Sequence, residues 1–293
     1  MATFYLSAFA DEAGSSLAEQ IDALRRNGIR FIEPRNIGGV SIVDHTDEQI
    51  LAIKKELDEA GIKVGSLGSP IGKYPINEDF APHFEKTKRA VEIAKLLGTN
   101  YIRMFSFFVS QDELSKYRDE VIARLTAMTE YAEENGVTLC HENESAIYGQ
   151  MPGEVYDILT SVPSLGGIFD PANYRMNDAD PIEGINATLG SFKYMHIKDA
   201  IFADQMIVPA GEGEGKIGEV IDIINGHTDA PVYLTLEPHL HIFDAYKDID
   251  EHELKGKYKF ESNAEAFDFA TNALKSLLLS LGYKEGEDKG WRK

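Results

Sequence analysis

Acidic and imidazole side chains stand at the ends of several β-rich runs in this sequence. The stretch 137–144 reads Val-Thr-Leu-Cys-His-Glu-Asn-Glu, so apolar β-formers run directly into charged residues. Similar runs end at Asp170, His196 and Glu237. A buried strand that ends in charge is costly unless something at its tip binds carboxylates. The repeated design therefore indicates a shared site at the strand ends.

The side chains in these runs suit a divalent cation. Carboxylates packed together repel one another and raise one another's pKa unless a cation neutralises them. Glu142, Asp170 and Glu237, with the imidazole of His196, would offer the oxygen and nitrogen ligands that Mn²⁺, Mg²⁺, Co²⁺ or Zn²⁺ accept. Taken singly, each residue is more simply a capping or salt-bridging group. Four of them at matching strand ends favour a site for one divalent metal ion.

Strand periodicity predicts that these side chains converge. Residues two apart in a strand share a face. On that rule the polar and inward faces would hold Thr138, Cys140 and Glu142 in one strand, Gly166, Ile168 and Asp170 in the next, then Tyr194, His196 and Lys198, and finally Tyr233, Thr235 and Glu237. The opposite face of the last strand is aliphatic and suits packing on helices.

Eight β-rich runs alternate with eight helical patterns, at a spacing of about 30–40 residues. The expected strands cover residues 3–9, 29–34, 63–68, 100–105, 137–144, 165–170, 192–197 and 231–237. The expected helices cover residues 16–27, 46–60, 84–97, 110–135, 152–161, 181–189, 217–225 and 262–281. Capping pairs begin four of them: Ser16 with Glu19, Thr46 with Gln49, Ser110 with Glu113, and Ser262 with Glu265. This alternation predicts an α/β fold with a parallel sheet closed into a (β/α)8 TIM barrel.

The domain organisation follows from the same pattern. The chain has no linker or shift in composition, so we expect one domain over residues 1–293. Two segments depart from the repeat: a long excursion over 238–261 and a polar tail over 282–293 that is expected to fray.

Composition limits the classes of partner and location. The 49 Asp and Glu residues exceed the 29 Lys and Arg residues, which gives a net charge of −20 and makes nucleic acid a poor partner. No apolar run approaches the ~20 residues that cross a membrane, so no membrane partner is expected. The single Cys140 excludes an intrachain disulfide framework, and the N-terminus has no basic region typical of a signal peptide. We therefore expect a cytoplasmic protein.

Several short motifs, taken in order, resemble those of one superfamily. They are His-Glu-Asn at 141–143, Phe-Asp-Pro-Ala-Asn at 169–173, His-Ile-Lys-Asp at 196–199, Pro-Ala-Gly-Glu-Gly at 209–213 and Leu-Glu-Pro at 236–238. The chain resembles the sugar phosphate isomerase/epimerase superfamily of xylose isomerase-like barrels over essentially the whole barrel. That grouping includes ketose 3-epimerases, hydroxypyruvate isomerase, inosose dehydratase and apurinic-site nucleases of the endonuclease IV type. By this resemblance, Glu142, Asp170, His196 and Glu237 match the family's metal ligands.

The resemblance also implies a mechanism. The metal would chelate two neighbouring oxygens of a ketose or keto-polyol and acidify the C–H between them. Glu142 or Glu237 would take that proton to give a cis-enediolate. Return from the opposite carboxylate would epimerise the centre, whereas transfer to the next carbon would isomerise the substrate. Lys198 would stabilise the enediolate or bind a substrate oxygen; a salt bridge to Asp199 or to a glutamate is the equal alternative.

Other polar residues are candidates for binding substrate. They are Glu33, Arg103, Glu144, Asn173, Glu212 and His239. For Glu144 the alternative is a loop salt bridge, and Glu212 belongs to a glycine-rich loop expected to cover the site. His239 opens the excursion with His241, Phe243 and Tyr246, which would line a pocket, form a subunit contact or simply pack a surface loop.

The sequence leaves several functions open. A metal-dependent isomerase or epimerase of a sugar, polyol or related keto compound is favoured, and a dehydratase on the same site is the nearest alternative. A Schiff-base aldolase built on Lys198 and a non-catalytic sugar-binding barrel are weaker alternatives. Asn173 stands where members of the resembled family that epimerise free ketoses or cut DNA commonly have a histidine, which disfavours a nuclease and leaves the epimerase subfamily open. No anion-binding motif supports a phosphorylated substrate, and a homo-oligomer is left open.

Overall fold

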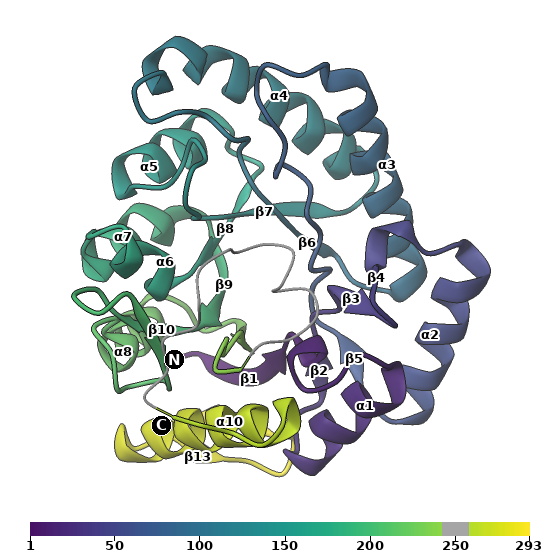
Figure 1. Cartoon of the computed structure of the whole chain (residues 1–293), viewed down its shortest axis with the longest axis vertical. Coiled ribbons are helices and arrows are strands. Elements are labelled where there is room, and N and C mark those ends of the chain that lie inside the picture. Colours follow the sequence, from purple (N-terminus) through teal and green to yellow (C-terminus); the bar gives the residue numbers. More distant parts are fainter. Residues whose placement is uncertain (242–257) are drawn as a thin grey trace.

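The strands of the central barrel lie in chain order around one axis (Figure 1). The structure is a computed structural model that describes residues 1–241 and 258–293. Within these residues the barrel strands are β1 (Thr3–Ala8), β2 (Phe31–Ile32), β5 (Lys63–Val64), β6 (Tyr101–Met104), β7 (Thr138–Glu142), β8 (Gly166–Phe169), β9 (Phe192–Ile197) and β12 (Pro231–Leu236). The predicted order of strands is confirmed, although β2 and β5 are much shorter than expected.

Backbone pairing closes the barrel. Strands β1, β12, β9, β8, β7 and β6 pair in this order and in parallel. Strand β2 pairs in parallel with β5. Two links complete the ring: the Glu33 N–H donates to the Ala8 carbonyl (3.0 Å), and Leu67 forms a parallel bridge with Ile102. The predicted (β/α)8 barrel is therefore confirmed.

Helices cover the outside of the barrel (Figure 1). They are α1 (Leu17–Arg26), α2 (Asp47–Glu59), α3 (Phe80–Leu97), α4 (Leu114–Glu134), α5 (Pro152–Ser161), α6 (Pro171–Met176), α7 (Pro181–Thr188), α8 (Ile217–His227) and α10 (Asn263–Ser280). Ser16 and Thr46 form the predicted capping boxes, and Ser262 accepts from the Glu265 N–H. The predicted cap at Ser110 is wrong: residues 110–113 form a turn in which the Ser110 carbonyl accepts from the Glu113 N–H. Helix α4 consequently begins at Leu114.

The core has an outer and an inner part, as strand alternation requires. The outer core packs aliphatic strand residues such as Leu234 and Leu236 against the helices. A separate inner cluster fills the barrel with Cys140, Ile168 and Tyr194, together with the rings of Tyr101 and Tyr233. These inner residues come from β6, β7, β8, β9 and β12 and form one packed layer. Cys140 is thus a buried core thiol whose pKa is raised by burial.

The C-terminal tail is ordered, so its predicted fraying is wrong. Residues Lys284–Glu285 (β13) and Gly290–Arg292 (β14) form a hairpin, and β14 pairs antiparallel with β1. Trp291 is only 3% exposed, because it packs into the outer core. One large aromatic side chain therefore anchors a segment whose average composition is polar.

Two hairpins absent from the prediction follow barrel strands. One comprises β3 (Asn36–Ile37) and β4 (Val40–Ser41), and the other β10 (Asp199–Ile201) and β11 (Met206–Val208). Most of the predicted excursion over 238–261, including Phe243 and Tyr246, lies outside the described residues. No helix in the described part of the chain is both long and apolar enough to span a bilayer.

Candidate metal and catalytic site

Four barrel strands bring Glu142, Asp170, His196 and Glu237 together. Glu142 ends β7, Asp170 follows β8, His196 lies in β9, and Glu237 follows β12. Their potential ligand atoms all lie within 4.8 Å of one another. The four residues are at most 4% exposed. The inner layer of the barrel precedes them on the same strand faces, so the strand alternation aims these side chains at one point.

His196 stands at the centre of the cluster. Its Nδ1 atom lies 2.9 Å from Glu142 Oε1 and 3.3 Å from Glu237 Oε2. The Lys198 ammonium lies 2.9 Å from Asp170 Oδ2 and 3.5 Å from Glu237 Oε2. The imidazole and the ammonium therefore both face the carboxylates at the end of β9.

The donor set fits a divalent cation. Glu237 Oε2 is buried and accepts no well-directed hydrogen bond from the described residues. Three carboxylates and one imidazole nitrogen are hard and intermediate donors of the kind that Mg²⁺, Mn²⁺, Co²⁺ and Zn²⁺ bind. The acidic and histidine cluster could thus hold a metal ion.

Two arginines, Arg35 after β2 and Arg103 in β6, bind the carboxylates. The Arg35 guanidinium forms a fork with Asp11 (3.0 and 3.1 Å) and donates to Glu237 Oε1 (3.1 Å). Arg103 Nη1 lies 3.4 Å from Glu142 Oε2. Each proposed base therefore has one oxygen paired with a guanidinium and the other directed at His196.

Sequence reasoning missed Asp11, Glu12 and Arg35. Arg35 Nη2 also donates to Glu12 Oε1 (3.3 Å), and all three side chains are buried. The Phe9 ring packs under both guanidiniums, with its centroid 4.4 Å from the Arg35 Cζ and 4.7 Å from the Arg103 Cζ. The sequence does contain a signal for them. Asp11 and Glu12 come shortly after the first strand, and Arg35 comes shortly after the second, at the strand ends where a barrel site is expected.

Electrostatics keep Glu142 and Glu237 ionised. Burial opposes ionisation at Glu142, but the His196 and Arg103 cations outweigh it and lower the pKa to about 2. Burial is likewise outweighed at Glu237, first by Lys198 and then by His196, so its pKa lies well below the usual range. Burial dominates at Asp170 and raises its pKa to about 7 despite Lys198. The two glutamates are therefore ionised at neutral pH, as a general base must be.

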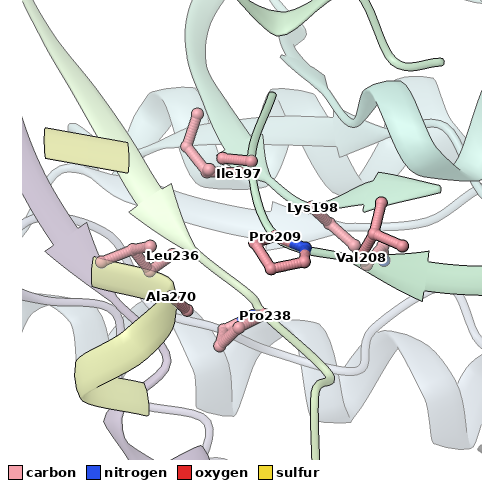
Figure 2. A pocket seen from close by; sticks show the side chains of 8 residues that line it. Ile197, Lys198, Val208, Pro209, Leu236, Pro238 and Ala270 are labelled. Atoms are coloured by element: carbon pink, nitrogen blue, oxygen red, sulfur yellow. The ribbon is translucent and has the colours of Figure 1, made fainter. Parts of the chain in front are cut away.

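Lys198 stays charged. Burial favours its neutral form, but Asp170 and Glu237 outweigh burial and raise the pKa of the amine. Figure 2 shows its side chain in a small pocket lined by Ile197, Lys198, Val208, Pro209, Ala210, Leu236, Pro238 and Ala270. The other lining residues are apolar, an environment that suits the aliphatic stem of a long cationic side chain. A cationic amine cannot act as a Schiff-base nucleophile, which disfavours the aldolase alternative.

The predicted substrate-binding residues fall into two groups. Glu33 is fully buried beneath His196, and Arg103 contacts Glu142. His239 Nε2 lies 3.4 Å from Glu237 Oε1. The Asn173 amide donates to the Asn143 carbonyl (2.8 Å) and so ties the loops after β7 and β8 together.

Glu144 and Glu212 lie further from the cluster centre. Glu144 pairs with Lys73 (3.0 Å), as the loop salt-bridge alternative predicted. Glu212 is exposed and accepts from the Tyr258 hydroxyl (2.7 and 2.6 Å).

The glycine-rich loop after β11 wraps a carboxylate of the protein itself. Asp199 accepts backbone N–H bonds from Gly211 (2.9 Å), Gly213 (3.1 Å) and Gly215 (2.8 Å). A Cβ atom at Gly213 would lie 2.3 Å from Asp199 Oδ1, so only glycine leaves room for this contact. The glycines therefore position the loop beside Lys198.

Fold and site together define a (β/α)8 barrel with an acidic and imidazole cluster at the carboxyl ends of its strands. A profile of the xylose isomerase-like TIM barrel family matches residues 21–255, and the chain belongs to this family. No curated protein sequence matches the chain.

Solved structures share the fold at low identity. The probable 3-DHS dehydratase AsbF from Bacillus anthracis is 16% identical over 94% of this chain and 99% of its own, with a TM-score of 0.69. D-psicose 3-epimerase, solved in the presence of D-fructose, is 16% identical over 95% of this chain and 99% of its own, with a TM-score of 0.69. A xylose isomerase-like TIM barrel protein from Mycobacterium smegmatis, in complex with magnesium, is 15% identical over 94% of this chain and 98% of its own, with a TM-score of 0.64.

Proposed function

We propose that this protein is a metal-dependent isomerase or epimerase that moves a proton on a sugar, polyol or related keto compound. The observation that carries the proposal is the convergence of four potential ligands, Glu142, Asp170, His196 and Glu237, within 4.8 Å at the ends of β7, β8, β9 and β12. Barrel enzymes carry their chemistry at this face.

These four residues would hold one Mg²⁺, Mn²⁺, Co²⁺ or Zn²⁺ ion. When bound, such an ion polarises neighbouring oxygens of a substrate and makes the C–H between them more acidic. The M. smegmatis relative with bound magnesium supports a divalent ion in this fold without selecting among the four metals.

Glu142 and Glu237 would be the two catalytic bases. Both are ionised, and they approach His196 from different strands, β7 and the end of β12. Arg103 and Arg35 each hold the outer oxygen of one glutamate and so orient its other oxygen toward the cluster. One glutamate would remove a proton from a carbon centre, and the second, after taking up a proton from solvent, would deliver that proton to the opposite face and so invert the centre. Return of the abstracted proton to the adjacent carbon would isomerise the substrate.

Lys198 would stabilise the negative charge that develops on the substrate. Its ammonium lies 3.5 Å from Glu237 Oε2, next to the proposed base, and the raised pKa keeps it cationic. Arg103, Glu144, Asn173, Glu212 and His239 remain candidates for binding the substrate. D-psicose 3-epimerase, with D-fructose present in its structure, supports an unphosphorylated ketose as the first substrate class to test.

Metal content and proton exchange test the proposal in two steps. Wild-type protein should bind about one divalent ion per chain, and His196→Ala should lose it. In deuterated water, the metal-loaded wild type should place deuterium on the carbon next to the carbonyl of a ketose or inosose, and Glu237→Gln should not. A wild type that binds no added divalent ion would overturn the proposal, as would full exchange activity in Glu237→Gln.

Dehydration on the same site is the second candidate. The Lys198 ammonium lies beside Glu237 and could protonate a leaving hydroxyl after the same proton abstraction. The likeness to a probable 3-DHS dehydratase supports testing this reaction. Mass spectrometry separates the two: a dehydratase product is lighter by one water, whereas an epimerised or isomerised product keeps its mass.

A nuclease remains disfavoured. The Asn173 amide is engaged with the Asn143 carbonyl, and the chain carries a net charge of −20, which opposes binding of a polyanion. The single domain, the cytoplasmic location and a homo-oligomeric state stay predictions.

A further inference from the structure

Glu33 lies under the candidate metal site at the end of a row of hydrogen-bonding side chains. It follows β2 and is 0% exposed. The Tyr194 hydroxyl donates to Glu33 Oε1 (2.8 Å), and Ser66 Oγ lies 2.7 Å from that hydroxyl. Glu33 is therefore held from below, with its second oxygen turned toward His196.

The two sides of the His196 ring face different groups. Nδ1 faces Glu142 and Glu237, whereas Nε2 lies 3.4 Å from Glu33 Oε2. Among the described residues, neither Nε2 nor Glu33 Oε2 has a hydrogen bond that meets ideal geometry, and both atoms are buried. The Phe9 ring packs edge-on against the imidazole (5.0 Å between centroids). Each of the two buried atoms is thus the natural partner of the other.

The tautomer of a ligating histidine depends on this kind of contact. An imidazole binds a metal through the nitrogen without a proton, and a carboxylate at the other nitrogen holds the remaining proton there. A carboxylate that accepts a hydrogen bond from the Nε2–H group and is itself anchored fixes the tautomer and the ring orientation together.

We propose that Glu33 is a positioning residue that keeps the proton of His196 on Nε2 and so presents Nδ1 to the metal ion. The inference rests on the proposed metal site. It replaces the sequence-based prediction that Glu33 contacts substrate, because a fully buried carboxylate beneath the imidazole, with Tyr194 on one oxygen and His196 beside the other, leaves no oxygen for a substrate. Tyr194 supports the arrangement by fixing Oε1.

The first test compares Mn²⁺ affinity of wild type and Glu33→Gln by isothermal titration calorimetry. Loss of an outer partner of a ligating histidine typically weakens metal binding by about 10- to 100-fold, and we expect a change in that range. Tyr101→Phe is the matched control, since it removes a hydroxyl from the same inner layer while keeping the ring that packs on Tyr194 and the carbonyl that accepts from Ser66. Its Mn²⁺ affinity should equal that of wild type.

The second test detects the His196 Nε2 proton directly by NMR. In Mg²⁺-saturated, ¹⁵N-histidine-labelled wild type, His196 should show a slowly exchanging Nε2–H resonance, assigned by its absence from His196→Gln. In Glu33→Gln this proton should exchange rapidly or its nitrogen shift should change. If Glu33→Gln does not fold, as judged by thermal unfolding, Tyr194→Phe should shift the same resonance and weaken Mn²⁺ binding by about threefold or more.

The outcomes separate the two proposals. A wild type that binds no Mn²⁺ overturns the proposed function and this inference with it. A wild type that binds Mn²⁺, with Glu33→Gln or Tyr194→Phe binding equally well, overturns the inference alone. Weaker binding with an unchanged Nε2–H resonance also overturns it, because a role in charge balance or packing would change affinity without moving that proton.

Discussion

The two halves of the barrel supply different chemistry to one site. Strands β7, β8, β9 and β12 carry the four potential ligands and are regular runs of four to six residues. Strands β2 and β5 in the other half contain two residues each, and the loop after β2 supplies Arg35. Arg103 comes from β6 in the same half. One half therefore carries the four potential ligands, and the other supplies two guanidiniums that pair with Glu142 and Glu237.

This division has a physical cause. Carboxylates within 4.8 Å of one another are costly to bury, and pairing with cations offsets much of that cost. Arg103 in β6 contacts Glu142 at the end of the neighbouring strand β7, and Arg35 after β2 binds Glu237, which lies two strands away after β12. Pairing with these two guanidiniums offsets part of the cost of burying Glu142 and Glu237.

The largest expected effect is a loss of turnover on changing Glu237, in the half of the barrel that carries the four potential ligands. Glu237→Gln should lower turnover by about 10³-fold or more, because it removes a proposed base and a negatively charged ligand at once. Glu219→Gln, an exposed change on α8, is the control and should keep wild-type turnover. Deuterium uptake by the substrate and thermal unfolding, measured together, distinguish lost chemistry from lost fold. A fully active Glu237→Gln would contradict the assignment.

The opposite half should matter more for stability. Arg35→Met leaves Asp11, Glu12 and Glu237 without their guanidinium, so we expect the free energy of unfolding of ion-free protein to fall by about 3–5 kcal/mol. Arg26 makes a similar fork with Asp268 on the surface, and Arg26→Met should cost at most about 1 kcal/mol. Urea unfolding of both variants measures the contrast. Equal losses of unfolding free energy in the two variants would show that burial does not determine how much each arginine–carboxylate pair contributes to stability.

Protonation of His83, a buried residue of α3, should make stability depend on pH. His83 accepts the Gly72 N–H (2.8 Å), and its pKa is lowered to about 4 by burial and by the Lys86 and Arg124 cations. Unfolded histidine binds its proton near pH 6.5, so this stability is present above pH 6.5 and is lost as pH falls toward 4. The loss should reach up to about 3 kcal/mol. Urea unfolding at pH 7, 6, 5 and 4.5 measures it.

His83→Gln is the control for that pH dependence. Its amide oxygen can accept the same N–H without titrating, so the slope of stability against pH should be smaller than in wild type. A residual slope is expected from His141, whose pKa burial also lowers to about 4. A slope identical to that of wild type would exclude His83 as its source.

The smallest expected effect concerns the glycine-rich loop that follows β11 and contains Gly213. Gly213→Ala places a methyl group 2.3 Å from Asp199 Oδ1, so the loop must shift, and we expect a loss of about 1–3 kcal/mol in the free energy of unfolding. Gly226→Ala on α8 meets no atom within 4 Å and should be neutral or stabilising by up to about 1 kcal/mol. Thermal unfolding compares them. A neutral Gly213→Ala would mean that the glycine-rich loop does not depend on Asp199.

Most of the architecture could be predicted from local patterns. Helix α5 and strand β9 match their predicted bounds, and the capping boxes at Ser16 and Thr46 form as expected. The predictions failed where a distant contact decides the local structure. The tail is ordered because Trp291 enters the outer core, and the turn at 110–113 displaces the start of α4.

The site, too, was predictable where local patterns decide it and not where distant contacts do. Alternation in a strand places Glu142, His196 and their neighbours on the inner face, and it does so from the sequence alone because the period of two is a property of the extended backbone. The partners of these residues are a property of the closed barrel. Glu33 meets His196 over 163 positions of sequence, and Arg35 meets Glu237 over 202. Barrel closure joins the first strands to the last, so only the tertiary structure decides which carboxylate holds the histidine and which arginine holds the base.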